Sequence, residues 1–190
     1  MPLEIEVKIR LDSAEAGRTL LSEHGYIPSG PREFESNVVF DTPSQGLRSA
    51  GQLIRIRRAG TRQILTYKGK SEGGTHKVRE ELELDVSDAD MLAGIFERLG
   101  YLPQFRYEKF RTQYGAPAEL GHVLLDETPI GDFLELEGPP GWIDQTAERL
   151  GFSTKEYLTS SYGALFSGFC RDRGVEGHEM VFDAKAGEEK

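Results

Sequence analysis

A strict alternation of charged and apolar residues near the N-terminus constrains the fold more than any other feature of this sequence. In residues 3–11, LEIEVKIRL, every second position is charged, and the positions between carry Leu, Ile or Val. A period of two is typical of a β-strand whose two faces meet different surroundings. Similar alternation, with charges of both signs, recurs along the chain. We therefore expect a protein built largely from two-faced strands.

Eight segments are predicted as strands from this alternation and from the turn residues between them. They cover residues 4–10, 35–41, 53–58, 62–68, 78–86, 105–114, 121–127 and 132–137. Seven of them carry ionisable residues at alternate positions, and the exception is Glu35–Asp41. Most are joined by short turns, which link antiparallel neighbours, and eight antiparallel strands can close into a small barrel.

Four helices are predicted between and after the strands. Asp12 or Ser13 can cap a helix that ends near residue 24, and Ser87 or Asp88 can cap one that ends near residue 99. Two further helices are expected near 142–150 and 155–169. The first two each follow a charged strand and end in a Gly-Tyr-x-Pro segment, which indicates two similar halves within one domain. We expect this domain to cover 1–170 and the polar residues 171–190 to form a flexible tail.

Composition argues against several classes of function. The 190 residues include 32 Asp and Glu against 23 Lys and Arg, a net charge of −9. This disfavours nucleic acid and anionic membranes as partners, although a local basic pocket stays compatible with it. The single Cys170 excludes an internal disulfide, and no apolar run is long enough to span a bilayer. Because the chain opens on a charged strand rather than a signal peptide, we expect a cytoplasmic protein.

The direction in which the charged strand faces point decides the function. Amphipathic helices must bury their apolar sides, and the apolar strand faces offer the surface for this if they lie on the outside of the barrel. The charged faces would then line the interior. The alternative, which the pattern leaves open, is an apolar centre with all charges in solvent. A charged interior requires water, pairing or a polyionic ligand, because burying an unpaired charge costs several kcal/mol.

A charged interior of this kind would mix carboxylates with Lys and Arg. Mg²⁺ and Mn²⁺ prefer carboxylate oxygens, whereas Arg and Lys bind phosphate oxygens. The mixture therefore points to a divalent metal together with a chain of phosphates. The candidate interior residues are Glu4, Glu6, Lys8, Arg10, Arg55, Arg57, Lys68, Arg79, Glu81, Glu83, Lys109, Arg111, Asp126, Glu135 and Glu137.

The order of these residues resembles a known family. Glu4-x-Glu6-x-Lys8 resembles the E-x-E-x-K signature of the CYTH superfamily, the triphosphate tunnel metalloenzymes, and the later charged pairs follow in the order of that family. The turn at 40–43, Phe-Asp-Thr-Pro, also resembles the family. The segment 161–165, Ser-Tyr-Gly-Ala-Leu, is similar to the C-terminal helix of its class IV adenylyl cyclase branch. The resemblance covers roughly residues 1–166.

The resemblance implies an α+β fold, an eight-stranded antiparallel β tunnel with a charged interior, flanked by helices. It implies Mg²⁺ or Mn²⁺ as the cofactor, with the metal ligands Glu4, Glu6, Asp126, Glu135 and Glu137. It implies a triphosphate cradle of Lys8, Arg55, Arg57, Lys68, Arg79, Lys109 and Arg111. It also implies a direct part in catalysis for Lys8, Lys68, Glu81 and Glu83, the two glutamates supporting the metal ligands.

The function implied by the resemblance is metal-dependent hydrolysis of a small-molecule triphosphate, either inorganic triphosphate or an organic or nucleoside triphosphate. The alternative is a class IV adenylyl cyclase, which converts ATP to cyclic AMP and pyrophosphate. A third hypothesis is a module that binds polyphosphate or a nucleotide without turnover. Class IV cyclases commonly carry a His-Phe pair before E-x-E-x-K, and Met1-Pro2-Leu3 stands there instead, which favours the hydrolase. Family members are often dimers, so a homodimer is also compatible with the resemblance.

Overall fold

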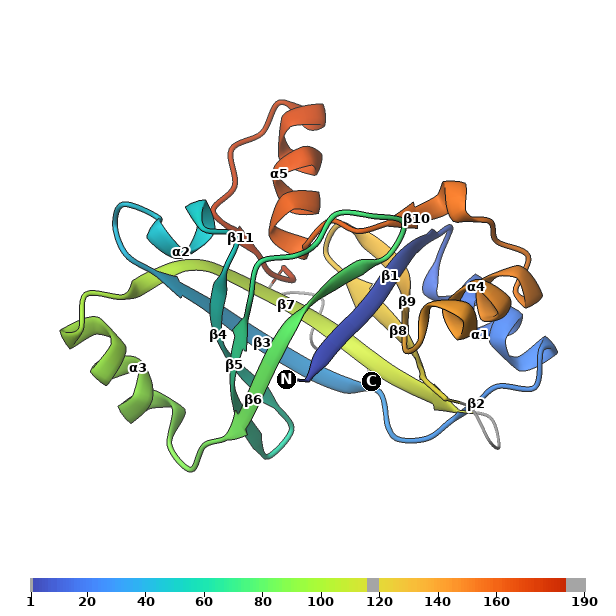
Figure 1. Cartoon of the computed structure of the whole chain (residues 1–190), viewed down its shortest axis with the longest axis horizontal. Coiled ribbons are helices and arrows are strands. Elements are labelled where there is room, and N and C mark those ends of the chain that lie inside the picture. The colour runs from blue at the N-terminus through green and yellow to red at the C-terminus, as the bar shows by residue number, and fades with distance from the viewer. Residues whose placement is uncertain (1, 116–119, 184–190) are drawn as a thin grey trace.

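Eight antiparallel strands close into a barrel in the computed structural model, which describes residues 2–115 and 120–183 (Figure 1). Each strand pairs with the next in the following order, and the last pairs again with the first. The order is β1 (Leu3–Leu11), β6 (Lys77–Asp85), β5 (Arg62–Lys68), β4 (Leu53–Ala59), β3 (Glu33–Asp41), β7 (Leu102–Gly115), β8 (His122–Thr128) and β9 (Gly131–Glu137). The predicted fold class is confirmed.

The apolar strand faces lie on the outside of the barrel, beneath the helices. Helices α1 (Ala14–Glu23) and α4 (Pro140–Arg149) pack on β1, β8 and β9 through a cluster that includes fully buried Val7, Leu21 and Ile143. On the opposite side, α3 (Ala89–Arg98) packs on apolar side chains of β3 and β4 (Figure 1). No helix in the described ranges has the length and apolar character needed to cross a membrane.

The first two predicted helices begin where their cap residues predict. The side chain of Ser13 accepts a hydrogen bond from the backbone N–H of Ala16, and that of Asp88 accepts one from Met91. Both helices leave backbone N–H groups without a partner in their first turn, and these side chains satisfy one each. A further short helix, α2 (Gly46–Ser49), follows the 42–45 turn and was not predicted.

The predicted helix at 155–169 is wrong at its start. Residues 154–156 form a 3₁₀ turn, η1 (Thr154–Glu156), and β10 (Tyr157–Leu158) follows it. The helix α5 begins only after Ser161 and covers Tyr162–Arg173. The reason lies in β1, which pairs with β6 only as far as Glu6, so that β10 supplies the backbone partner for the next part of that edge.

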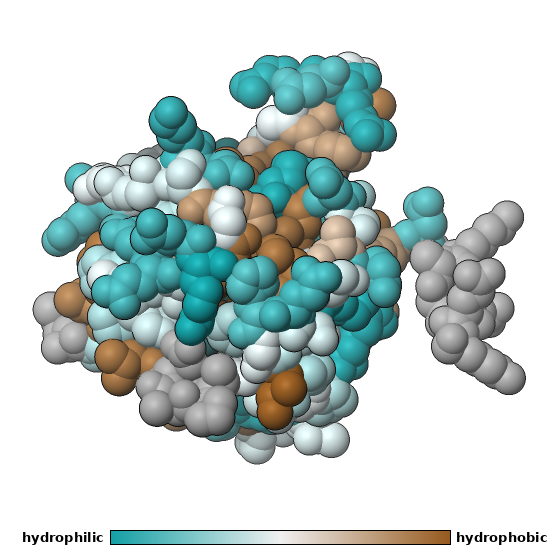
Figure 2. All heavy atoms as spheres, turned by 90° about the vertical axis from the view of Figure 1, so that its right-hand side faces the viewer, coloured by the Kyte–Doolittle hydropathy of each residue, from teal (hydrophilic) through white to brown (hydrophobic). Residues whose placement is uncertain are grey.

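Part of the segment expected to be a flexible tail contacts the barrel. After α5, β11 (Glu179–Met180) pairs in parallel with β7, and the backbone N–H of Phe182 donates to Glu108 at 3.1 Å. Figure 2 shows apolar atoms gathered at the foot of the projecting helix α5, and Met180 is fully buried in the cluster beneath it. The flexibility expected for residues 171–190 stays a prediction. Residues 184–190 lie outside the described part of the chain.

Shortening Met180 tests this packing. Met180→Ala is expected to lower the free energy of unfolding by about 3 kcal/mol, because it removes a fully buried side chain and leaves a cavity. Chemical denaturation measures the change. Val175→Ala, at an exposed position of the same segment, is the control and should have little effect. Equal stability of Met180→Ala and the wild type would show that the segment does not pack as described.

Candidate functional site

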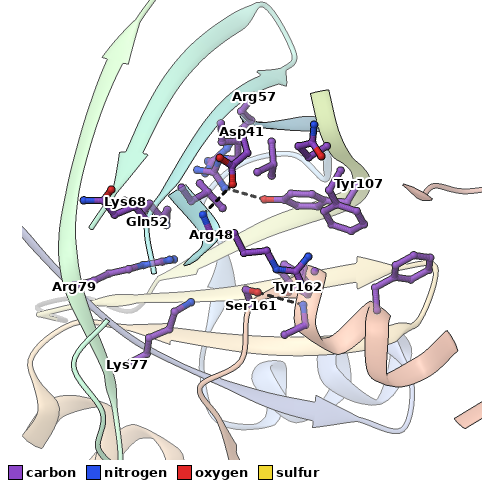
Figure 3. Close-up of a pocket in the computed structure, with 18 of the residues that line it drawn as sticks. Asp41, Arg48, Gln52, Arg57, Lys68, Lys77, Arg79, Tyr107, Ser161 and Tyr162 are labelled. Atoms are coloured by element: carbon purple, nitrogen blue, oxygen red, sulfur yellow. Dashed lines mark hydrogen bonds between the residues drawn. The ribbon is translucent and has the colours of Figure 1, made fainter. Parts of the chain in front are cut away.

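The charged strand faces line a cavity of about 770 Å³ inside the barrel, which opens between α2 and α5 (Figure 3). The alternative of an apolar centre is therefore wrong. Most of the interior residues expected from the sequence line this cavity, namely Glu4, Glu6, Lys8, Arg55, Arg57, Lys68, Arg79, Glu81, Glu83, Lys109, Arg111, Glu135 and Glu137.

Two expected interior residues do not line the cavity. Arg10 is exposed near the end of β1, where it donates to the carbonyl of Ile130 and lies over the ring of Phe133. Asp126 is fully buried behind the cavity wall. There it accepts hydrogen bonds from Lys109 at 2.8 Å and from the hydroxyl of Tyr162 at 2.7 Å. Asp126 therefore reaches the cavity through its partners.

Glu4 lies at the centre of one group of ion pairs. It accepts hydrogen bonds from Lys68 at 2.7 Å and from Arg79 at 2.9 Å. Burial and the carboxylate of Glu6 raise the pKa of Glu4, but the two cations outweigh them and lower it to about 2. Burial, with the neighbouring Glu4, raises the pKa of Glu81 to about 7 although Lys68 lies 3.0 Å away. The Glu4 carboxylate is thus ionised at neutral pH, whereas Glu81 is poised to exchange a proton.

Lys8 bridges two carboxylates from different strands. Its Nζ lies 3.1 Å from Glu6 on its own strand and 3.1 Å from Glu135 on β9. Burial lowers the pKa of Lys8, but Glu135 and Glu6 outweigh this and raise it above its usual value. Arg111 also contacts Glu135 and forms a bidentate pair with Asp126 at 2.6 Å for each bond. This half of the wall is therefore a continuous network of alternating charges.

Lys77 is a cavity residue that the sequence analysis did not identify. Its Nζ donates to Glu6 at 2.6 Å, and burial together with Lys8 and Arg79 lowers its pKa to about 8. Lys77 is in phase with Arg79, but the predicted strand began one residue later. Placing the strand start at residue 77 would have included it.

Arg55 and Arg57 on β4 keep hydrogen-bonding capacity to spare. Arg55 donates to the hydroxyls of Tyr107 and Thr66 at 3.0 Å each, but its buried Nε has no partner among the described residues. Arg57 lies 3.7 Å from both Glu35 and Glu83, too far for strong hydrogen bonds, and its Nε likewise has no partner within residues 2–115 and 120–183. Two guanidinium groups with free donors side by side are suited to phosphate oxygens.

The strand β3, the exception in the sequence analysis, also contributes polar interior residues. Glu35 is 3% exposed and lies 3.5 Å from Lys109, and fully buried Asn37 has no hydrogen-bond partner for either side-chain atom in the described residues. Neither lines the cavity, so both lie behind the cations. A signal existed: Glu35, Asn37 and Asp41 share one phase of the strand.

The pH dependence of the free energy of unfolding should reveal the contribution of the Glu35 ion pairs. Burial raises the pKa of Glu35, but Lys109, Arg111 and Arg57 outweigh it and lower the pKa from 4.5 to about 2. Because the folded pKa lies below the unfolded one, the carboxylate stabilises the fold above pH 4.5, and this contribution is lost as the pH falls toward 2. Glu35→Gln is expected to lower the free energy of unfolding at pH 7 by about 2–3 kcal/mol. The difference from the wild type should shrink below pH 4.5.

Urea denaturation between pH 3 and 7 measures this difference. The control is Glu97→Gln at an exposed position of α3, which should leave the wild-type curve unchanged. A constant difference between Glu35→Gln and the wild type across that range would contradict the assignment to ionisation of Glu35.

Whether the site suits a divalent metal depends on its carboxylate oxygens. No group of three or more His, Cys, Asp or Glu side chains in residues 2–115 and 120–183 is arranged as a metal site, because Lys and Arg occupy the carboxylates. Glu137 differs: no ion pair of it is found within the described residues, and burial with Glu4, Glu135 and Glu6 raises its pKa. The carboxylate oxygens of Glu137, with Glu4 and Glu6 close enough to raise its pKa, are the donor type that a hard divalent cation prefers.

Comparison with known proteins places this chain in a family. The family model of the CYTH domain matches residues 2–162. The chain belongs to the CYTH family. The E-x-E-x-K motif by which the resemblance was first noted forms the inner face of β1 in this CYTH protein, and the later motif residues line the same cavity or, for Asp126, its supporting wall. Their individual roles stay predictions.

Individual relatives of this CYTH protein come from archaea, bacteria and plants. It is 27% identical over 135 residues to "Putative adenylate cyclase MJ0240" of Methanocaldococcus jannaschii, covering 71% of this chain and 76% of that protein. A "putative adenylate cyclase" structure from Vibrio parahaemolyticus has a TM-score of 0.75 at 18% identity, over 87% of this chain and 98% of that one. HpAC1 from Hippeastrum has a TM-score of 0.66 at 20% identity, over 92% and 97%. The two structural matches show a shared fold.

Proposed function

We propose that this CYTH protein catalyses metal-dependent hydrolysis of a triphosphate bound in its tunnel. The observation that carries the proposal is the lining of the cavity, where cationic side chains from five strands face carboxylates across one enclosed space. A module that only binds phosphate needs cations but has little use for Glu4, Glu6, Glu135 and Glu137. The carboxylates are explained if the ligand is a triphosphate together with Mg²⁺ or Mn²⁺.

The side chains of the tunnel would act by positioning and by electrostatic stabilisation. Arg55, Arg57, Lys68 and Arg79 would bind phosphate oxygens, and Lys109 and Arg111 on β7 would do the same. These contacts strengthen as charge moves onto the equatorial and leaving oxygens, which is where phosphoryl transfer needs stabilisation. A bound divalent cation would supply charge neutralisation and water activation. No nucleophilic side chain is required.

Binding of metal and triphosphate would be coupled. In the present structure several of the cations are paired with carboxylates, as Lys68 and Arg79 are paired with Glu4. A triphosphate that takes the cations frees the carboxylates, and a metal that takes the carboxylates frees the cations. Each ligand therefore lowers the free-energy cost of admitting the other.

A second candidate function is an adenylyl cyclase. Relatives from Methanocaldococcus jannaschii and Vibrio parahaemolyticus carry that name as a "putative" assignment, whereas HpAC1 of Hippeastrum is described as a putative adenylyl cyclase with a dominant triphosphatase activity. The feature of this chain that favours a cyclase is the 161–165 segment, which begins α5 at the cavity opening. A nucleoside group could be held there.

A substrate panel with product identification tests the proposal. The full chain is incubated with Mg²⁺ or Mn²⁺ and either inorganic triphosphate, ATP or thiamine triphosphate. Orthophosphate from any of the three supports hydrolysis, whereas cyclic AMP and pyrophosphate from ATP identify a cyclase. Tight binding of a triphosphate without any product in either metal would refute both and leave a binding module.

A further inference from the structure

The cavity continues beyond the cationic lining to a mouth, and most side chains of this mouth are not of the kind that binds phosphate. This mouth is formed by α2, the start of β7, α5 and the segment that returns after α5, with Arg48, Gln52, Phe105, Phe166 and His178 on its walls. Figure 3 shows Arg48 between Asp41 and Tyr162, with its side chain directed across the pocket. The segment expected to be a free tail thus supplies part of the wall.

The size of the cavity exceeds what a triphosphate requires. A volume of about 770 Å³ lies within the range of roughly 300–1,000 Å³ that encloses drug-sized organic ligands. The ion-paired side chains of this space are mostly buried, whereas Phe105 is half-buried and Arg48 is exposed at the mouth. The division indicates one region for phosphates and another for an organic group.

An aromatic wall joins the two regions. The rings of Phe105 and Tyr107 are stacked with centroids 5.6 Å apart and an interplanar angle of 20°, and Phe166 lies 5.7 Å from Phe105. The hydroxyl of Tyr107 accepts a hydrogen bond from Arg55 of the phosphate cradle. Phe105 is only half-buried, so it can stack against a planar ring attached to the bound phosphates.

The mouth carries an arginine side chain that is paired with no acid in the described part of the chain. The guanidinium group of Arg48 has no ion pair or hydrogen bond with any described residue, in contrast to the paired cations deeper inside. Asp41 is close in the chain, but its carboxylate is used by the backbone N–H groups of Thr42, Leu47 and Arg48 at 2.7–2.9 Å. A cationic ring would be repelled here, whereas a neutral ring offers Arg48 a π-face and acceptor atoms.

We infer that this mouth binds the uncharged ring of a nucleoside triphosphate and that Arg48 selects against triphosphates with a cationic organic group. The inference rests on the proposed function, since it assumes that the triphosphate lies in the cradle. It assigns specificity to residues that are separate from the charged interior.

Three substrates separate the two regions in one experiment. ATP carries a neutral ring, thiamine triphosphate carries a cationic one, and inorganic triphosphate has none. Arg48→Ala is expected to lower kcat/KM for ATP by about tenfold and to change it for inorganic triphosphate by less than about threefold. Arg48→Glu should raise the ratio of kcat/KM for thiamine triphosphate to that for ATP by about tenfold or more.

Two further variants complete the design. Phe105→Leu keeps an apolar side chain but removes the stacking face, so it should affect ATP more than inorganic triphosphate. Arg58→Ala removes an arginine that lies outside the barrel and pairs with Asp90, and it should leave all three substrates as in the wild type. An equal loss on all three substrates in Arg48→Ala, or an unchanged ratio in Arg48→Glu, would overturn the inference.

Failure of the proposed function gives a different result. If the wild type hydrolyses none of the three, titration calorimetry with the same compounds and variants tests the inference through binding. The expected result is tighter binding of ATP than of inorganic triphosphate, with that preference lost in Arg48→Glu. Equal dissociation constants for the two compounds in the wild type would refute it.

Discussion

Replacing Glu6 with glutamine is expected to lower metal-stimulated triphosphate hydrolysis by about a thousandfold. Glu6 is buried, lies within hydrogen-bond distance of Lys8 and Lys77, and adds to the negative charge that raises the pKa of Glu137. The amide keeps the shape of the side chain but removes the charge that a divalent cation and both lysines require. The concentration of Mg²⁺ needed for half-maximal rate should rise as well.

Initial rates at several Mg²⁺ concentrations measure this effect, and thermal unfolding shows whether the variant is folded. The matched control is Glu80→Gln, since Glu80 lies on β6 next to this wall but does not line the cavity. The control should retain wild-type kinetics. If Glu6→Gln keeps near-normal rates and the same Mg²⁺ dependence, the carboxylate face of β1 does not hold the metal.

Replacing Arg57 with alanine is expected to raise KM for the triphosphate by about a hundredfold, with a smaller fall in kcat. Arg57 lines the cavity, and its nearest carboxylates lie 3.7 Å away, so most of its hydrogen-bonding capacity is available to a ligand. Loss of a bidentate, charge-assisted contact with phosphate accounts for a change of this size. Arg57→Lys should recover only part of it, because a lysine offers a single point charge.

The next residue along the chain provides the matched control. Arg58 points to the opposite side of β4, where it pairs with Asp90 at 2.6 Å. Arg58→Ala changes the net charge of the protein by the same amount as Arg57→Ala, yet it should leave KM within about twofold of the wild type, because exposed ion pairs contribute little. Equal effects of the two substitutions would mean that the response reflects overall charge and not the tunnel.

The local patterns of this sequence predicted most of the elements that form the tunnel. The alternation around Glu6 is visible without any partner strand, and the caps at Ser13 and Asp88 are set by neighbours three residues away. The elements that were not predicted are those whose formation depends on a segment distant in the chain. β10 forms because an edge of β1 is free, and residues 179–182 become ordered because β7 and the apolar cluster under α5 receive them.

The interior residues behind the cations had only a weak signal in the sequence. Glu35 and Asn37 lie on a strand with little alternating charge, and their burial follows from closure of the barrel around them. The place of Arg48 at the cavity mouth could not be predicted from the sequence, because the mouth is formed by α2 and α5, which are far apart in the chain.

By itself, the sequence determined that this chain has two-faced strands and amphipathic helices, because each of these follows from residues close together in the chain. The pattern left two directions open for the charged faces, and the structure decided that they point into the barrel. Only the tertiary structure decided which cation meets which carboxylate. Lys68 and Glu4 are 64 residues apart and Lys77 and Glu6 are 71 apart. Such pairs depend on the register between strands and on the closure of β9 onto β1, and a pattern within one strand carries no information on either.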